Sequence, residues 1–233
     1  MAWSGVLLPR TVIFSTITID GKIASKSRFS QLSCPHDLKR LHELRAQCDA
    51  VMVGANTVII DDPSLRLKYV EGRNPDRIIV DGMLRTPLNA RVYTLRTAKT
   101  LVLTTRMAPS DKVEKLRSMG VEVLLLAERP PINMRKAMEV LGSLGYKTIM
   151  VEGGGELIWY LFKDCVVNEL RVTIAPYIFG GRESVSLVMG EGFSTTAESP
   201  IFKLRSIERC LCGNEIHLIY DVEYRVRDHD SKC

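Results

Sequence analysis

The 233-residue sequence lacks most of the short motifs that indicate a particular chemistry on their own. Its four histidines show no H-E-x-x-H spacing, and its six cysteines form no C-x-x-C pair. A G-x-S-x-G elbow and a Walker A lysine are also missing. These absences argue against zinc hydrolases, zinc deaminases, α/β-hydrolases and P-loop enzymes. We therefore expect no metal site.

Long apolar runs and blocks of like charge are missing as well. No segment approaches the roughly 20 apolar residues of a membrane span, and no basic leader precedes the short apolar run in "MAWSGVLLPR". The formal net charge of +5 is scattered, which argues against nucleic acid and favours small anionic ligands. The cysteines are too dispersed for a disulfide framework, so we expect reduced thiols and a cytoplasmic location.

What the sequence contains is an alternation of strand-like and helix-like segments. Residues 10–24 predict a strand, a turn at Asp20-Gly21 and a second short extended piece. Further strands are predicted in "AVMVG", "RIIVDG", "KTLVLTT", "VEVLLL" and "YKTIMVE". Helices are predicted in "PHDLKRLHELRAQC", with Ser33 or Cys34 at the cap, in "SDKVEKLRSMG", capped by Ser110 and ended by Gly120, and in "NMRKAMEVLGSLG". The alternation implies an α/β fold with a mainly parallel sheet covered on both faces.

The last third of the chain has a different texture. "VVNELRVTIAPYIFGG", "PIFKLRSIERCLC" and "EIHLIYDVEYRV" are strand-like, with no convincing helix between them. They predict an antiparallel extension of the sheet. We expect one domain over residues 1–226 and a frayed polar tail over 227–233.

Polar residues and glycines follow four of the predicted strands. Taken singly, each group is explained by a tight turn. Because a parallel sheet brings its strand exits to one edge, a shared ligand cleft is the simpler interpretation. The four groups are Asp20 and Lys22; Gly54, Asn56, Thr57, Asp61 and Asp62; Asp81, Gly82 and Arg85; and Glu152 with Gly153 to Gly155.

The three consecutive glycines stand where a strand meets a helix-like segment, in "TIMVEGGGELIWYLF". They allow either a phosphate bound by backbone N–H groups at a helix N-terminus or a tight turn without a ligand. The stretch alone supports both equally. Because no nucleophile, metal motif or acid/base dyad is evident, any chemistry is expected to come from a cofactor such as a nicotinamide.

Five motifs in order carry a family resemblance: "TIDGKIA", "LRAQCDAVMVGANTVIIDDPSL", "NPDRIIVDGMLRTPLNARV", "IMVEGGGELIWYLF" and "VNELRVTIAPYIFGG". Over nearly its whole length the chain resembles the stand-alone archaeal and fungal reductase of riboflavin biosynthesis. The resemblance implies a dihydrofolate reductase-like fold, a homodimer and a single-function enzyme. It also implies reduction of 2,5-diamino-6-ribosylamino-4(3H)-pyrimidinone 5′-phosphate by NADPH, with NADH as an alternative donor, through hydride transfer to C1′ of the opened ribose imine.

The resemblance also assigns site residues. Arg85 is placed to contact an adenosine 2′-phosphate, and Arg45 and Lys68 to contact the substrate's 5′-phosphate. Asp20 and Glu152 are candidate catalytic residues that protonate, polarise or only hydrogen-bond the opened sugar. Cofactor contacts are expected at Thr57, Asp61, Gly82, Met83, Leu84, Arg85, Gly153, Gly154, Gly155 and Glu156. Substrate contacts are expected at Ser30, Ser33, Arg45, Leu65, Lys68 and Glu152.

Two other functions stay open at this point. A pterin or folate reductase of the same general fold would need a buried carboxylate facing the pterin ring. A non-catalytic nucleotide-binding sensor would need only the phosphate-binding corner. Of the three hypotheses, only the reductase of riboflavin biosynthesis predicts loss of the nicotinamide absorbance when NADPH is mixed with the ribosylamino substrate.

Overall fold

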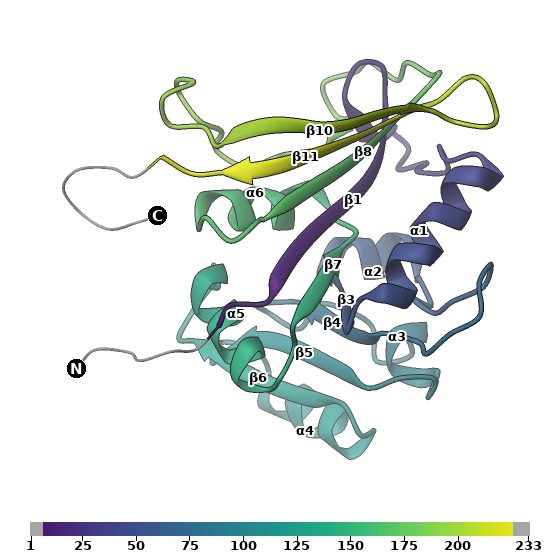
Figure 1. The fold of residues 1–233 in the computed structure, drawn as a ribbon. Helices are drawn as coiled ribbons and strands as arrows, with labels where there is room; N and C mark the ends of the chain where they lie inside the picture. The colour runs from purple at the N-terminus through teal and green to yellow at the C-terminus, as the bar shows by residue number, and fades with distance from the viewer. Residues whose placement is uncertain (1–6, 226–233) are drawn as a thin grey trace.

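The computed structural model describes residues 7–225, which form a nine-stranded sheet with helices packed against it (Figure 1). The sheet order is β10-β11-β8-β1-β7-β3-β4-β5-β6, and β2 pairs with β9 in a separate small sheet. The strands are β1 (Arg10–Thr18), β2 (Lys22–Ala24), β3 (Ala50–Gly54), β4 (Asp76–Val80), β5 (Thr100–Thr105), β6 (Glu122–Ala127), β7 (Thr148–Val151), β8 (Glu169–Ala175), β9 (Val185–Ser186), β10 (Ile201–Arg209) and β11 (Ile216–Glu223). The helices are α1 (Pro35–Gln47), α2 (Ala55–Asp61), α3 (Arg91–Thr94), α4 (Ser110–Ser118), α5 (Met134–Ser143) and α6 (Gly155–Lys163).

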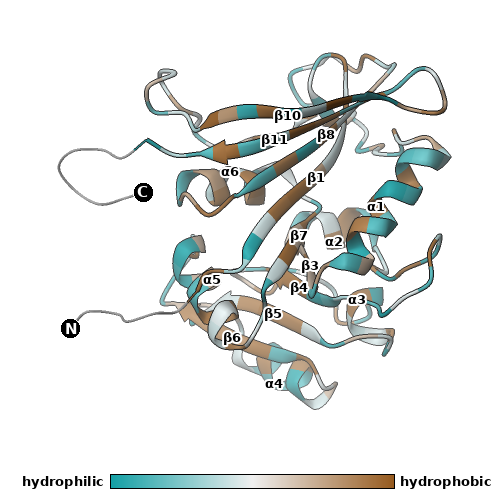
Figure 2. Cartoon of the chain, viewed as in Figure 1, coloured by the Kyte–Doolittle hydropathy of each residue, from teal (hydrophilic) through white to brown (hydrophobic). Residues whose placement is uncertain are grey.

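Every neighbouring pair from β8 to β6 in this order is parallel, whereas β11 is antiparallel to both β8 and β10. The predicted fold class, a mainly parallel sheet with an antiparallel C-terminal part, is confirmed. The central strands are apolar and buried because helices cover both faces, and Figure 2 shows hydrophobic residues concentrated there while α1 is largely hydrophilic.

The two faces of the sheet build two separate cores. Along β3, Met52 packs with residues of α5 and α6, whereas Val51 and Val53 pack with residues of α1 and α4. Successive side chains of a strand point to opposite faces, so one apolar strand supplies both cores. The sheet is thereby held rigid at the edge where its strands end.

Three local features differ from the sequence predictions. The short helices α2 and α3 were not predicted, because each is too brief to show a helical repeat of apolar residues. Ser110 was wrongly predicted as a cap: Pro109 is the N-cap of α4, and Ser110 is its first helical residue. Cys34 is the N-cap of α1, and Gly120 follows α4 with φ +82°, as a helix-ending glycine does.

The cysteines agree only in part with the expected reduced thiols. Cys34, Cys48, Cys210 and Cys212 are free, but Cys165 is disulfide-bonded, which contradicts the expectation at that position. Within residues 7–225, no helix combines the length and apolar character that crossing a membrane requires. The predicted frayed tail, 227–233, lies outside the described residues.

Candidate active site

A cleft of about 1320 Å³ opens at the carboxyl ends of the parallel strands. Residues of the predicted groups after β3, β4 and β7 line it, so three of the four groups at strand exits share one cleft, although Asp62 and Gly153 do not line it. Sequence reasoning had marked these lining residues: Asn56, Thr57 and Asp61 from α2; Gly82, Met83 and Arg85 after β4; and Glu152, Gly154, Gly155 and Glu156 at the start of α6.

The fourth group, after β1, does not line the cleft. The Asp20 carboxylate accepts hydrogen bonds from the Thr18 hydroxyl at 2.6 Å and from the backbone N–H of Gly180 at 2.8 Å. The hydrogen bond from Thr18 is the main reason that the pKa of this exposed carboxyl lies below its ordinary value. Asp20 therefore stays ionised and holds the loop after β8, which is a poor arrangement for a proton donor.

The glycine turn between β7 and α6 exposes backbone to the cleft. Gly153 has φ +108° and is joined to Gly154 by a cis peptide bond, and its carbonyl accepts a hydrogen bond from Gly54 N–H at 2.9 Å. Gly153 itself is not a lining residue, whereas Gly154 is both the N-cap of α6 and part of the cleft wall. Since no side chain caps α6, the N–H groups of its first turn are available to an anion.

Gly155 differs from Gly154 because it has no room for a side chain. A Cβ at Gly155 would lie 2.6 Å from the Ser186 carbonyl oxygen and 2.5 Å from Met189 Cγ, whereas a Cβ at Gly154 would meet only Thr57 Oγ1, at 3.6 Å. We expect Gly155→Ala to lower the free energy of unfolding by about 2 kcal/mol. In thermal melts this variant should lose about 4–8 °C while Gly154→Ala stays near wild type. Equal melting temperatures would contradict the packing argument.

Glu152 and Arg45 form a buried ion pair beside the cleft. Arg45 donates from Nε to Glu152 Oε1 at 2.5 Å and from Nη2 to Oε2 at 2.6 Å, and its Nη1 donates to the Arg66 carbonyl at 3.0 Å. The two side chains are only 9% and 11% exposed. Glu152 lines the cleft but Arg45 does not. In this structure the Arg45 guanidinium is engaged with Glu152, and the expected contact of Arg45 with the substrate's phosphate stays a prediction.

The other predicted substrate residues divide between the cleft and its supports. Ser30, Ser33 and Leu65 line the cleft, and Ser33 is hydrogen-bonded to the Thr16 hydroxyl at 2.7 Å. Lys68 does not line it. The Lys68 backbone N–H instead donates to Nδ1 of His42 at 3.1 Å, which ties the segment after α2 to α1.

Two of the predicted cofactor residues do not line the cleft: Gly153, described above, and Leu84. Leu84 is a buried residue with φ +49° and does not line the cleft, although its neighbours Met83 and Arg85 do. Its carbonyl accepts a hydrogen bond from Lys112 Nζ at 2.5 Å. Leu84 therefore shapes the turn after β4.

His42 gives this region a defined pH dependence. Burial, reinforced by the charge of Arg45, lowers the pKa of His42 from 6.5 to about 4. The folded chain thus favours the neutral ring, whose stabilising effect is complete above pH 6.5 and is lost as the pH falls towards 4. Between pH 6.5 and pH 4 the free energy of unfolding should fall, and we expect His42 to account for about 3 kcal/mol of this decrease. Chemical unfolding at stepped pH checks this, and His42→Gln should flatten the profile.

Several lining residues carried no usable signal in the sequence. Val185 and Met189 reach the cleft from the segment after β8, and Pro130 and Pro131 reach it from the loop before α5. They are apolar residues in loops or, for Val185, in the two-residue strand β9, and only the tertiary fold brings them to this edge. Asn56 is different, because its place after a strand had marked it; its Oδ1 accepts from Arg85 Nη2 at 2.8 Å.

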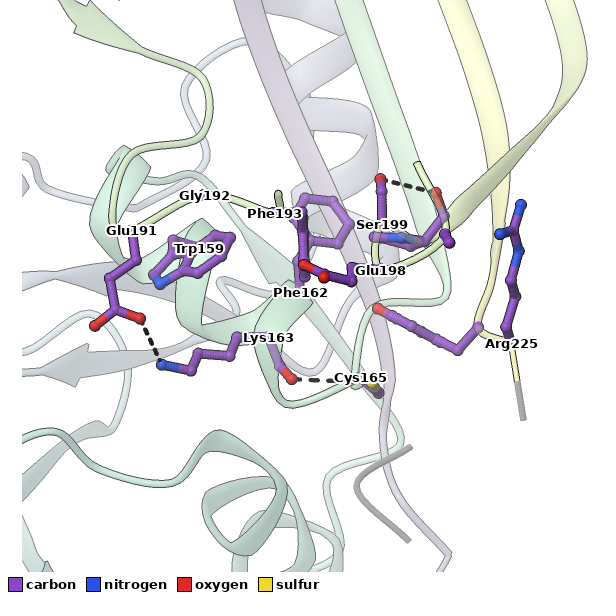
Figure 3. Close-up of a pocket in the computed structure, with 13 residues that line it drawn as sticks. Trp159, Phe162, Lys163, Cys165, Glu191, Gly192, Phe193, Glu198, Ser199 and Arg225 are labelled. Carbon is purple, nitrogen blue, oxygen red and sulfur yellow. Dashed lines mark hydrogen bonds and ion pairs between the residues drawn. The ribbon is translucent and has the colours of Figure 1, made fainter. Parts of the chain in front are cut away.

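A second, smaller cavity of about 230 Å³ is lined by residues of the C-terminal half of α6 and of the segment between β9 and β10 (Figure 3). Trp159, Phe162 and Phe193 form its apolar wall, and Lys163 pairs with Glu191 at 3.1 Å at its mouth. It contains none of the predicted site residues. The larger cleft is therefore the candidate active site.

A parallel sheet that ends in a glycine turn and an uncapped helix, beside a cleft with a fixed carboxylate, is an α/β architecture typical of proteins that bind phosphate-containing ligands. Residues 9–218 match the family model described as the RibD C-terminal domain. The chain belongs to this family.

Two curated relatives match over most of their own length. The 2,5-diamino-6-ribosylamino-4(3H)-pyrimidinone 5′-phosphate reductase of Methanothermobacter thermautotrophicus is 39% identical, over 84% of this chain and 91% of the relative. The protein of the same name from Aquifex aeolicus is 36% identical, over 94% of this chain and 99% of the relative.

Solved structures show the same fold. A pyrimidine reductase-like protein from Corynebacterium diphtheriae superposes with a TM-score of 0.79 at 21% identity, covering 94% of this chain and 93% of that one. Dihydrofolate reductase from Enterococcus faecalis gives a TM-score of 0.50 at 13% identity, covering 93% and 99%. The predicted dihydrofolate reductase-like fold is confirmed.

Proposed function

We propose that this protein reduces 2,5-diamino-6-ribosylamino-4(3H)-pyrimidinone 5′-phosphate to the ribitylamino product with NADPH. The observation that carries the proposal is the uncapped N-terminus of α6, which faces the same cleft as the anchored carboxylate of Glu152. The curated relatives that match nearly the whole chain bear the name of this reductase. The reaction belongs to riboflavin biosynthesis.

The residues present fit a nicotinamide dinucleotide. A diphosphate would be held by the first-turn N–H groups of α6, where the helix dipole favours negative charge. Gly82, Met83 and Arg85 form the wall on which the adenosine half would lie, and Thr57 and Asp61 lie on the neighbouring α2. The cofactor supplies the hydride that reduces C1′ of the opened ribose imine. The chain's task is to orient both ligands and to exclude water.

Glu152 is the side chain that we propose contacts the sugar of the substrate. The bidentate pair with Arg45 holds its carboxylate in one orientation, as an acceptor for sugar hydroxyls. Ser30 and Ser33 add hydroxyl groups from the loop before α1, and Leu65 adds an apolar wall. Lys68 remains our candidate for the 5′-phosphate. Asp20 acts through the loop that it holds.

Arg85 is proposed to select NADPH over NADH. Its guanidinium is exposed at the cleft, where Asn56 holds it through the hydrogen bond at 2.8 Å. We expect Arg85→Gln to raise KM for NADPH by about 10–100-fold and to leave KM for NADH nearly unchanged, because only NADPH carries the 2′-phosphate. Steady-state kinetics with both donors measures this. A parallel rise in both KM values would contradict the role.

Mixing the protein with NADPH and the ribosylamino phosphate tests the whole proposal. Loss of the nicotinamide absorbance together with formation of the ribitylamino product is the expected result. Oxidation of NADPH by dihydrofolate or dihydropterin, without turnover of the ribosylamino compound, would instead favour a pterin or folate reductase. Binding of NADPH without turnover of any of these substrates would favour a nucleotide sensor.

We further propose a cytoplasmic homodimer. The β10 strand lies at the edge of the large sheet and exposes Ile201, Leu204 and Ile207. An exposed apolar edge strand is a pairing surface that a second copy can cover. Light scattering coupled to gel filtration should give twice the mass of one chain, and Leu204→Lys with Ile207→Lys should give the monomer.

A further inference from the structure

Three cysteines and a glutamate meet at the N-terminal end of α1, whereas Arg45, the partner of Glu152, lies in the last turn of this helix. The cluster consists of Cys34, Cys210, Cys212 and Glu215, and one potential ligand atom from each lies within 4.8 Å of all the others. Cys34 is the N-cap of α1, whereas the other three belong to the hairpin that joins β10 to β11. Figure 1 shows this hairpin beside the start of α1.

The spacing of the ligand atoms fits a four-coordinate metal site, and Cys34, Cys210 and Cys212 are free of disulfides. The Sγ atoms of Cys34 and Cys210 are 3.5 Å apart. A disulfide needs about 2.0 Å between its sulfur atoms. A tetrahedral zinc site, with zinc–sulfur bonds of about 2.3 Å, places its sulfur atoms about 3.8 Å apart. The observed spacing therefore needs only a small adjustment to accept a central ion.

Glu215 provides independent support for a ligand. Its side chain is buried at 2% exposure, and Oε1 accepts a hydrogen bond from Cys34 N–H at 2.8 Å. The other oxygen, Oε2, is buried with no hydrogen-bond partner. A buried carboxylate oxygen without a partner is costly, and binding a cation removes that cost.

Backbone N–H groups surround two of the three sulfur atoms. The backbone N–H of Asp37 donates to Cys34 Sγ at 3.5 Å, and the N–H groups of Asn214 and Glu215 hydrogen-bond to the sulfur of Cys212. Such donors around the sulfur atoms are the usual outer shell of a metal site. Arg209 spans the hairpin, donating from Nε and Nη2 to the Gly213 carbonyl at 2.9 and 2.8 Å, and so fixes the turn that carries Cys210 and Cys212.

We propose that Cys34, Cys210, Cys212 and Glu215 bind one Zn²⁺ ion. Three soft sulfur ligands and one carboxylate select zinc over Mg²⁺ or Ca²⁺, which require oxygen ligands. With all four positions filled by the protein, the site is structural. The ion clamps the β10–β11 hairpin to the start of α1, directly after the loop whose Ser30 and Ser33 line the active-site cleft. If this site binds zinc, the expectation from the sequence that the protein has no metal site is wrong.

The test uses the full chain, prepared with Zn²⁺ and then dialysed. Elemental analysis should find one zinc per chain. Exchange for Co²⁺ should give the thiolate-to-cobalt charge-transfer band and the intense visible bands of a tetrahedral site. Cys212→Ser should weaken zinc binding by at least about 100-fold in a competition assay with a chromogenic chelator. Cys48→Ala removes a free thiol outside the cluster and should bind zinc as wild type does.

Other results would overturn the site. Four alkylatable thiols with no bound metal would exclude it, and a Cys34–Cys210 disulfide in peptide mapping would assign the cluster to redox chemistry instead. If Cys212→Ser fails to fold, Glu215→Gln and the cobalt spectrum of the unaltered chain decide the question. A cobalt spectrum without thiolate charge transfer contradicts the proposal.

Discussion

Replacing Glu152 with Gln is expected to lower kcat/KM for the proposed reduction by at least about 100-fold, the effect of losing one fixed electrostatic partner in an active site. The change leaves the Arg45 guanidinium buried without its counter-charge. Removing one partner of such a pair costs about 3 kcal/mol of unfolding free energy. Stopped assays with the ribosylamino phosphate and denaturant titrations measure the two effects separately.

A double variant separates the chemical role of Glu152 from its structural one. Arg45→Met combined with Glu152→Leu removes both charges and keeps the volume apolar, so most of the lost stability should return. Activity should stay low, since no carboxylate then faces the cleft. Arg45→Met alone should lower kcat, because the Glu152 carboxylate loses the guanidinium that holds it in one orientation. A double variant with wild-type activity would show that the carboxylate has no part in the reaction.

Gly154→Asp is expected to weaken NADPH binding by on the order of 100-fold while the fold persists. The backbone of Gly154, with φ −78°, suits any residue, and its Cβ would meet only Thr57 Oγ1 at 3.6 Å. The new carboxylate would lie at the N-terminus of α6. There it would occupy the place of the diphosphate and repel its negative charge. Isothermal titration with NADPH measures the loss.

The matched variants are Gly154→Ala and Gly154→Asn. Alanine adds bulk without charge, and asparagine adds the same bulk as aspartate without its charge. We expect the affinity for NADPH to fall only slightly in the Gly154→Ala variant, more in Gly154→Asn, and most in Gly154→Asp. Wild-type affinity in all three would show that the diphosphate does not occupy this corner, and the proposed cofactor site would have to move.

Much of the fold was predictable because its signals are local. The apolar run "AVMVG", the helical spacing after Pro35 and the glycines after β7 each depend on neighbours in sequence. Alternation of such segments restricts the sheet to parallel pairs with right-handed crossovers. The exits of β3, β4 and β7 were thereby expected at one edge, where they lie.

Other features of the site depend on residues far apart in the chain. Nothing near Arg45 in the sequence indicates that its guanidinium pairs with Glu152, and without that partner a phosphate contact was the natural expectation. The short helix α2 forms although its seven residues carry no clear repeat, because it is packed against β3. Its formation places Thr57 and Asp61 at the cleft.

The sequence by itself determined the order and type of most elements, the glycine turn and the edge of the sheet at which the cleft lies. Only the tertiary structure decided that Arg45 serves Glu152, that Asp20 lies outside the cleft and that Cys34 meets Cys210 and Cys212. The reason is physical. Backbone preference and apolar periodicity act over a few residues, whereas the pairing of buried charges and thiols depends on which distant segments packing brings together.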